Sequence, residues 1–292
     1  MTNIIQTHQL TKRFTLESVI TSVNMNIKEG EGASIYLFMK QPAKTITIGE
    51  YKSISHIDVK LDMLNIDFTS SPDDKIHVQI KGHQLNKKRV GIREENERFV
   101  VEEQQQKKKW TDYIHLRQTP TILVQIPKGQ LKTLTLHTVD GNSTINKLVL
   151  DSVEIKTAAG DAILKNMSIS NANIQTKDGS VSIAKSSIED FSITTNAGDV
   201  SIKDSTGINH KIQTVDGQIN ITEAKEQPKL QAKSTSGDIR IHYKKAPDSL
   251  RITTAGEDIE IMLPNYNKKT HIIGKGDNML SAETKDGAVL IK

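Results

Sequence analysis

The chain has 292 residues and a net charge of +4 from 39 basic and 35 acidic residues, a balance that gives no reason to expect a nucleic-acid partner. It contains no cysteine, which excludes disulfide bonds, thiolate metal sites and cysteine nucleophiles. Aromatic residues make up 4% of the chain, and this low share suits a core of thin β-branched columns.

No targeting segment is visible near the start of the chain. The longest apolar run there, residues 35–39, is too short for a signal-peptide core or a transmembrane helix. The chain as given is therefore expected to lack a transmembrane segment and to stay in the cytoplasm.

Residues 1–45 differ in character from the rest of the chain. Segments 4–14 and 22–31 resemble the opening of an ABC-transporter ATPase subunit of the antibiotic-exporter type, a family in which the aromatic residue matching Phe14 stacks on adenine. Residues 35–45 stand in the place of the P-loop but lack its glycines, whose backbone N–H groups wrap phosphates. Lys44 and Thr45 are therefore not expected to bind a nucleotide, and we interpret this segment as a non-functional remnant.

Residues 46–130 are predicted to form an N-terminal β region. Apolar and polar residues alternate over 51–61, 64–68 and 76–80, and a turn is predicted at 70–74. The polar run 102–109 is predicted to be a solvated loop. Its lysines followed by Trp110 and Tyr113 offer the alternative of a site for an anionic polymer.

A 19-residue repeat organises residues 131–292. Turn glycines recur at intervals of 19 residues and then once at 20: Gly141, Gly160, Gly179, Gly198, Gly217 and Gly237. Hydroxyl residues stand three positions before the glycines, at Thr138, Thr157, Thr176, Thr195, Thr214 and Ser234. Apolar residues stand five before and four after each glycine with a spacing of two on each flank, which is typical of strands.

Each repeat is predicted to be a strand, a turn at glycine, a second strand and a short return. A unit this short cannot bury its own apolar face, so stacked copies must share a core. The sequence therefore predicts an all-β fold, a single-stranded β-solenoid (β-helix-like) of about 19-residue rungs. The threonines are expected to form hydroxyl ladders between rungs, and the glycines to mark a positive φ or a close approach of backbone.

Acidic residues cluster at the turns. Asp140, Asp178 and Asp216 precede a turn glycine, whereas Asp161, Asp199 and Asp238 follow one. This alternation is expected to relieve repulsion between like charges on neighbouring rungs. A calcium column is the alternative, but that motif has a nine-residue period with several glycines, so we assign no metal or cofactor.

The outward side chains give no sign of catalysis. The outward residues four positions before the glycines, such as His137, Lys156, Gln175, Thr194 and Gln213, contain no paired carboxylates of the kind that a glycosidase needs. The nine histidines show no metal-ligand spacing and are expected on the surface. No catalytic residue is therefore assigned.

The repeat loosens after Gly237. Residues 252–261 fit it only if Glu257 holds the turn position, and it returns in full at 282–291, where the chain ends at Lys292. The last rung is therefore expected to leave a free edge through which a second copy could pair.

The region 46–292 resembles the bacterial putative-adhesin family of LiaG-like proteins, a domain of largely unassigned function. The residues that carry this resemblance are segment 76–82, the strand 122–127 and units such as Thr195–Ile202. The resemblance implies a non-enzymatic binding or scaffold protein associated with the cell envelope, with an envelope protein or polymer as partner. A carbohydrate-active solenoid enzyme and an accessory component of an ABC-type exporter are the alternatives.

Overall fold

The computed structural model describes residues 3–7, 12–14, 17–20, 25–28, 43–52, 54–82, 85–95, 98–104 and 119–292. The chain divides into two compact units, Met1–Lys44 and Thr45–Lys292. In the first unit, β1 (Asn3–Thr7) pairs with β4 (Met25–Lys28) and β2 (Lys12–Phe14) pairs with β3 (Glu17–Ile20), both antiparallel. Trp110 and Tyr113, with the lysines before them, lie outside the described residues.

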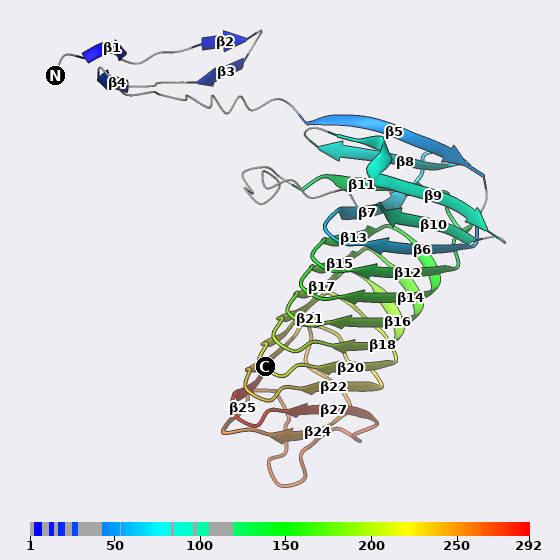
Figure 1. Cartoon of the computed structure of the whole chain (residues 1–292). Coiled ribbons are helices and arrows are strands. Elements are labelled where there is room, and N and C mark those ends of the chain that lie inside the picture. The colour runs from blue at the N-terminus through cyan, green and yellow to red at the C-terminus, as the bar shows by residue number, and fades with distance from the viewer. Residues whose placement is uncertain are drawn as a thin grey trace. The chain divides into compact units, whose positions relative to one another are not determined.

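The second unit is the predicted β-solenoid, with two 12-stranded sheets that face each other (Figure 1). Sheet I has the strand order β26-β24-β27-β22-β20-β18-β16-β14-β12-β6-β10-β9. Sheet II has the order β25-β28-β23-β21-β19-β17-β15-β13-β7-β11-β8-β5. Each rung contributes one strand to each sheet, and neighbouring rungs pair in parallel.

The regular rungs follow the predicted pattern of a strand, a glycine turn and a second strand. Their strands are β12 (Thr133–Thr138) and β13 (Ser143–Asn146), β14 (Val149–Thr157) and β15 (Ala162–Lys165), β16 (Ser168–Thr176) and β17 (Val181–Ala184), β18 (Ser187–Thr194) and β19 (Val200–Lys203), β20 (Asn209–Gln213) and β21 (Ile219–Ala224), and β22 (Lys229–Lys233) and β23 (Ile239–Tyr243).

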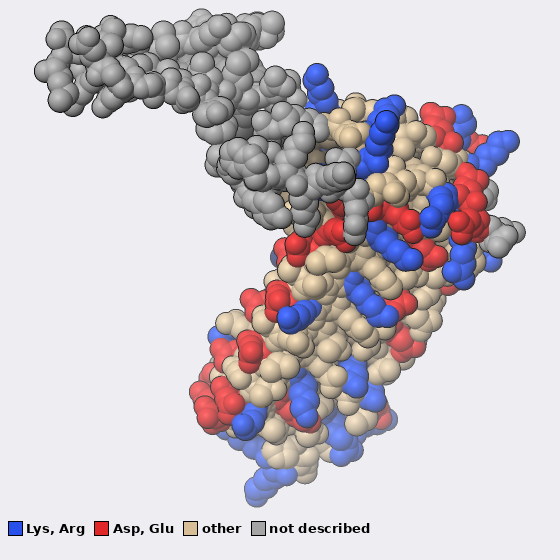
Figure 2. Space-filling model, viewed as in Figure 1, with Lys and Arg blue, Asp and Glu red and all other residues tan. Residues whose placement is uncertain are grey.

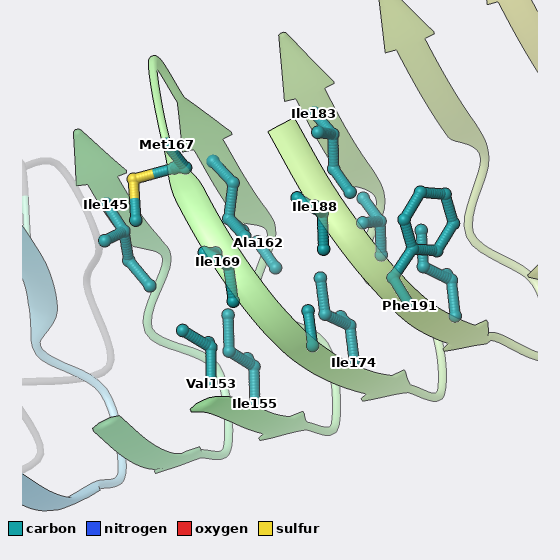
Figure 3. Packing of buried hydrophobic residues seen from close by; sticks show 14 of the residues in the cluster. Ile145, Val153, Ile155, Ala162, Met167, Ile169, Ile174, Ile183, Ile188 and Phe191 are labelled. Carbon is teal, nitrogen blue, oxygen red and sulfur yellow. The ribbon is translucent and has the colours of Figure 1, made fainter. Parts of the chain in front are cut away.

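The core lies between the two sheets as columns of apolar side chains. Ile155 pairs with Ile174, and Ile174 pairs with Ile193, on successive strands of sheet I. Leu164 and Ile183 form the matching column in sheet II, and all five side chains are buried. Figure 3 shows these columns from close by, with side chains of the two sheets meeting in the space between them. Along each strand, alternation with period two therefore points every second side chain into the core and the others outward.

The N-terminal end of the stack begins earlier than residue 131. Strands β6 (His56–Leu61) and β7 (Asn65–Ser70) pair in parallel with β12 and β13 in the same register as the later rungs. Leu61 and Leu64 occupy the threonine and glycine positions of this first rung. The rung escaped the sequence prediction because it lacks both signature residues.

The remaining strands at this end are β5 (Lys44–Tyr51), β8 (Ile76–Gly82), β9 (Val90–Glu95), β10 (Arg98–Glu103) and β11 (Thr121–Ile126). Strands β10 and β11 add to β6 and β7 in parallel, and β9 and β8 then pair antiparallel with them. This reversal of direction ends the parallel stack.

Glu103 closes the turn of the first rung. One carboxylate oxygen, Oε2, accepts the backbone N–H groups of Asp62, Met63 and Leu64 at 2.8–3.0 Å, and the other accepts from Arg89 Nη2 at 2.7 Å. Burial alone would raise the pKa of Glu103, but these hydrogen bonds outweigh burial and hold the pKa below its usual value. The carboxylate thus replaces two carbonyl groups that a preceding rung would supply and the threonine hydroxyl that this rung lacks.

At the C-terminal end, the order of rungs in space differs from their order in sequence. Strands β27 (Asn278–Glu283) and β28 (Ala288–Ile291) lie between β22 and β23 on one side and β24 (Leu250–Ala255) and β25 (Asp258–Ile261) on the other. The prediction of a free edge at the chain end is therefore wrong, since β28 is paired on both sides. The outermost strands are β25 in sheet II and the short β26 (Ile272–Ile273) in sheet I.

The turn residues explain this order. Gly287 fits against Gly237, and Thr284 Oγ1 donates to the Gly237 carbonyl at 3.0 Å. The rung 250–261 has Glu257 where a turn glycine would stand. Its turn meets the neighbouring rung through Gly256, which lies against the Gly287 carbonyl, and through the N–H of Glu257, which donates to that carbonyl at 3.2 Å.

Candidate functional site

The turn glycines are required by close approach between rungs. A Cβ atom on Gly160, Gly179, Gly198 or Gly217 would overlap the carbonyl oxygen of the preceding turn glycine. None of these four residues has a positive φ, so close approach is the one of the two predicted reasons that is confirmed. The glycines therefore form a column in which each backbone packs directly on the one before it.

The threonine hydroxyls bind backbone groups. Thr157 Oγ1 accepts the N–H of Gly160 at 3.0 Å within its own rung and donates to the carbonyl of Val139, one rung earlier, at 3.4 Å. The equivalent N–H contacts recur at 2.9–3.0 Å for Thr176, Thr195, Thr214 and Ser234. The contacts between rungs run from hydroxyl to carbonyl, and the Thr138 hydroxyl is buried without a partner.

The aspartates that follow the turn glycines also hold neighbouring rungs together. Asp161 accepts the backbone N–H of Ser180, and Asp199 accepts that of Gln218, at 2.9 and 2.8 Å. Asp238 does the same for Ala288 in the rung that is its neighbour in space. These residues therefore serve the fold, and Asp140, Asp178 and Asp216 remain on the exposed side of the turns.

The second turn of each rung has a feature that the sequence analysis missed. One residue at the end of each sheet II strand adopts a left-handed conformation, with φ of 46–58°. These residues are Lys147, Asn166, Lys185, Asp204 and Glu223. These positions follow the same 19-residue interval. The recurrence of polar residues at this interval could have indicated the turn. However, none of these residues is glycine, which usually marks a left-handed conformation.

His210 is buried, contrary to the expectation that the histidines lie on the surface. Its ring stacks on Phe191 with centroids 3.8 Å apart. Nε2 donates to the carbonyl of Ile188, and Nδ1 accepts from the side chain of Gln227, both at 2.9 Å. Burial lowers the pKa of His210 to about 4, so the ring is neutral and belongs to the core.

No enclosed catalytic or metal site is found among the described residues. No group of three metal-ligating side chains occurs in that part of the chain. A depression lined by Lys229, Arg251 and Met279 has a volume of about 30 Å³, room for about one water molecule. A larger concavity of about 640 Å³ beside Asp73 and Lys128 is wide open and polar, unlike the largely apolar pockets that hold small molecules.

The outer face of sheet I provides an extended surface of uncharged hydrogen-bonding groups. We call the outward amide and hydroxyl side chains of residues 171–175 in β16, 190–194 in β18 and 209–213 in β20 the amide face: Asn171, Asn173, Gln175, Ser192, Thr194, Asn209 and Gln213. Within the described residues, no other protein side chain hydrogen-bonds to these groups. Figure 2 shows uncharged atoms over much of the middle of this side of the solenoid.

The amide face is flat and regular because it follows the rungs. Asn173, Ser192 and Lys211 are direct neighbours across β16, β18 and β20, at a rung spacing of about 4.8 Å. Asp190 and Lys211 are the charged side chains that lie among these amides and hydroxyls on the same strands. Such a surface suits a long ligand with repeated hydroxyl or amide groups.

Lys44 and Thr45 begin strand β5, so the described structure has no loop and helix there to wrap a phosphate. No comparison with known proteins supports the resemblance of residues 1–45 to an ABC-transporter ATPase. No described helix is long and apolar enough to cross a membrane.

Comparison with protein families gives one match. The model of the Toastrack DUF4097 family matches residues 54–292, which covers most of the chain. No curated protein matches the chain.

Solved structures of low sequence identity share the fold. A protein described as a putative adhesin from Bacteroides fragilis is 15% identical, with a TM-score of 0.53 over 85% of this chain and 97% of its own. One from Parabacteroides distasonis described in the same words is 11% identical, with a TM-score of 0.55 over 86% and 98%. A protein described as a putative lipid binding protein from the same species is 14% identical, with a TM-score of 0.50 over 87% and 98%.

Proposed function

Since the chain belongs to the Toastrack DUF4097 family, we propose that it is a non-enzymatic scaffold that binds a polymer of the bacterial cell envelope. The amide face is the observation that carries this proposal. Its amides and hydroxyls lie on neighbouring rungs, and no side chain in the described part of the chain hydrogen-bonds to them. They suit a polymer that offers hydroxyl and amide groups along its length.

The residues of the repeat itself are unavailable for binding. The turn glycines, the threonine hydroxyls and the carboxylates of Asp161 and Asp199 are occupied by contacts between rungs. A ligand must therefore use the outward side chains. Envelope association is consistent with the description of two fold relatives as putative adhesins.

A carbohydrate-active enzyme is the rival function, and the outer face of sheet I offers little for it. Glu154 and Asp190 are carboxylates of this face, but they lie on β14 and β18, which are separated by β16. A glycosidase needs two carboxyl groups that flank one scissile bond. No observation favours the third alternative, a component of an ABC-type exporter.

Co-sedimentation of the full chain with purified, insoluble peptidoglycan sacculi tests the proposal. Half of the sacculi keep their covalently attached polymers and half are stripped of them. Saturable pelleting of the chain with either preparation, without release of reducing ends, is the expected result. A chain that stays in the supernatant with both, or that releases reducing ends from either, would overturn the proposal.

A further inference from the structure

The outer face of sheet II has its charges sorted onto two opposite sides. Along one side, at the glycine turns, each of five successive rungs carries a carboxylate, and we call this side the aspartate edge: Asp140, Asp161, Asp178, Asp199 and Asp216. Along the other side, where the strands of sheet II end, each of four successive rungs carries a cation, and we call this side the lysine corner: Lys147, Lys165, Lys185 and Lys203. Figure 2 shows carboxylates spaced along the left margin of the solenoid.

On each side, every one of these rungs carries one charged residue, although its position in the sequence of the rung shifts by one or two residues. At the lysine corner, the lysine has the left-handed conformation in two rungs, Lys147 and Lys185. In the two rungs between and after them, Asn166 and Asp204 take that conformation and the lysine stands one residue earlier. The aspartates alternate in the same way before and after the glycines. Asp161 and Asp199 serve stacking through the N–H groups of the next rung, but among the described residues no such contact involves the side chains of Asp140, Asp178 or Asp216. At the lysine corner, a positional need of the backbone does not explain the pattern, because the lysine holds the left-handed position in two rungs and precedes it in the other two.

These charges have few ion-pair partners in the part of the chain that the structure describes. Among the described residues, no carboxylate lies within ion-pair distance of Lys147, Lys165 or Lys185. Lys203 pairs with Glu223 at 3.1 Å. Asp140, Asp178 and Asp216 likewise have no ion pair in that part of the chain. Three cations and three carboxylates that have no ion pair with any described residue thus face solvent on opposite sides of the same sheet.

The strip between the two sides is narrow and nearly flat. Each strand of sheet II in these rungs spans about four residues, so about 13 Å separates the aspartate edge from the lysine corner. The outward residues of the strip are Thr144, Ile163, Ser182, Ser201 and Asn220. These side chains are uncharged, and most are small, so a second flat surface can approach closely.

We propose that a second copy of this chain docks on this face, with sheet II against sheet II. A two-fold axis parallel to the stack exchanges left and right, so each aspartate edge meets the lysine corner of the partner on both sides. The rungs of the two copies match because they have the same spacing. A two-fold axis across the stack would instead place like charges together. The charge pattern therefore selects a closed, parallel dimer.

The dimer is expected to be weak and sensitive to salt. The facing strip is about 24 Å long over five rungs, well below the size of a standard stable interface. Exposed ion pairs contribute little individually and are screened by salt. Association is therefore expected at high protein concentration and low ionic strength, with loss of the dimer at about 0.5 M salt.

Sedimentation velocity of the full chain with charge-reversed variants tests this proposal. One variant carries Lys147→Glu, Lys165→Glu and Lys185→Glu, and the other carries Asp140→Lys, Asp178→Lys and Asp216→Lys. Each variant alone should dimerise at least tenfold more weakly than the unaltered chain, because like charges then oppose each other. An equimolar mixture should form heterodimers, since both contacts become attractive again.

Thermal unfolding of each variant verifies that it folds, and neutral Gln and Asn replacements at the same positions substitute for any variant that does not. An unaltered chain that is monomeric at low salt would overturn the proposal, as would a mixture that stays monomeric. A monomeric chain that binds heparin through Lys147, Lys165 and Lys185 would also overturn it and would assign the lysine corner to polyanions.

Discussion

Gly179 packs directly on the carbonyl group of Gly160, the turn glycine of the preceding rung, and leaves no space for a Cβ atom. The same relationship recurs along the turn column, from Gly141 on Leu64 to Gly237 on Gly217. The repeat of 19 residues is therefore set by backbone contact at the turn as well as by the apolar columns of the core.

Gly179→Ala is expected to destabilise the protein by about 3 kcal/mol, because the added methyl group must displace the backbone of the neighbouring rung. Ser180→Ala is the matched control, since Ser180 is exposed in the same turn. Its effect should stay within about 0.5 kcal/mol. Thermal unfolding followed by circular dichroism measures both, and equal midpoints would contradict the close-packed column.

Thr157→Val should cost about 1–3 kcal/mol of stability, because the buried N–H of Gly160 loses its acceptor while the side-chain volume is kept. Thr157→Ser retains the hydroxyl and should cost less than the valine variant. Chemical denaturation compares the two. A serine variant as unstable as the valine variant would show that the methyl group, rather than the hydroxyl, stabilises the turn.

His210 predicts a dependence of stability on pH. The pKa of its ring is lowered to about 4 in the folded protein, from about 6.5 in the unfolded chain. Between these values the unfolded chain binds a proton that the folded protein does not, so stability is full above pH 6.5 and falls as the pH drops toward 4. The loss from this group reaches about 3 kcal/mol at most.

Denaturation at a series of pH values checks this dependence with His210→Phe. The variant should lose the part of the pH slope between 6.5 and 4 that belongs to this ring, whatever its absolute stability. His242→Asn, at an exposed position on sheet II, is the control and should keep the slope. An unchanged slope in His210→Phe would contradict the buried neutral ring.

The sequence predicted the regular rungs because each slot recurs at a fixed distance from a turn glycine. The same register shows that His210 was predictable, since it stands seven residues before Gly217, a slot held elsewhere by Leu134, Val153 and Phe191. The left-handed corner was hidden because polar residues other than glycine occupy it. The first rung was missed because Leu61 and Leu64 replace the threonine and glycine.

Rung order at the C-terminus was not predictable from the sequence. The template identified both 250–261 and 282–291 as rungs, but periodicity carries no information on which rung contacts which. That choice depends on the turn contact of Gly287 with Gly237 and on the hydrogen bonds of Glu226. Its carboxylate accepts the N–H groups of Asp248 and Ser249 and the side chain of Asn278.

Engineered disulfides test this rung order, since the chain has no cysteine of its own. Ala232 and Ala282 are paired neighbours, so Ala232→Cys with Ala282→Cys should cross-link on oxidation. Thr254 is paired with Ala282 instead, which puts it about 10 Å from Ala232, too far for a disulfide. Mass spectrometry distinguishes the products, and a bridge in the Ala232→Cys, Thr254→Cys variant would show that the rungs stack in sequence order.

The central claim is that the repeat residues build the stack while the amide face binds the envelope polymer. Co-sedimentation with sacculi tests it most directly, using Asn171→Ala, Asn173→Ala and Gln175→Ala in one chain. Asn196→Ala with Ser180→Ala, at exposed turn positions, is the control. We predict at least tenfold weaker binding for the triple variant at an unchanged unfolding midpoint, and full binding for the control. Undiminished binding by a folded triple variant would contradict the account.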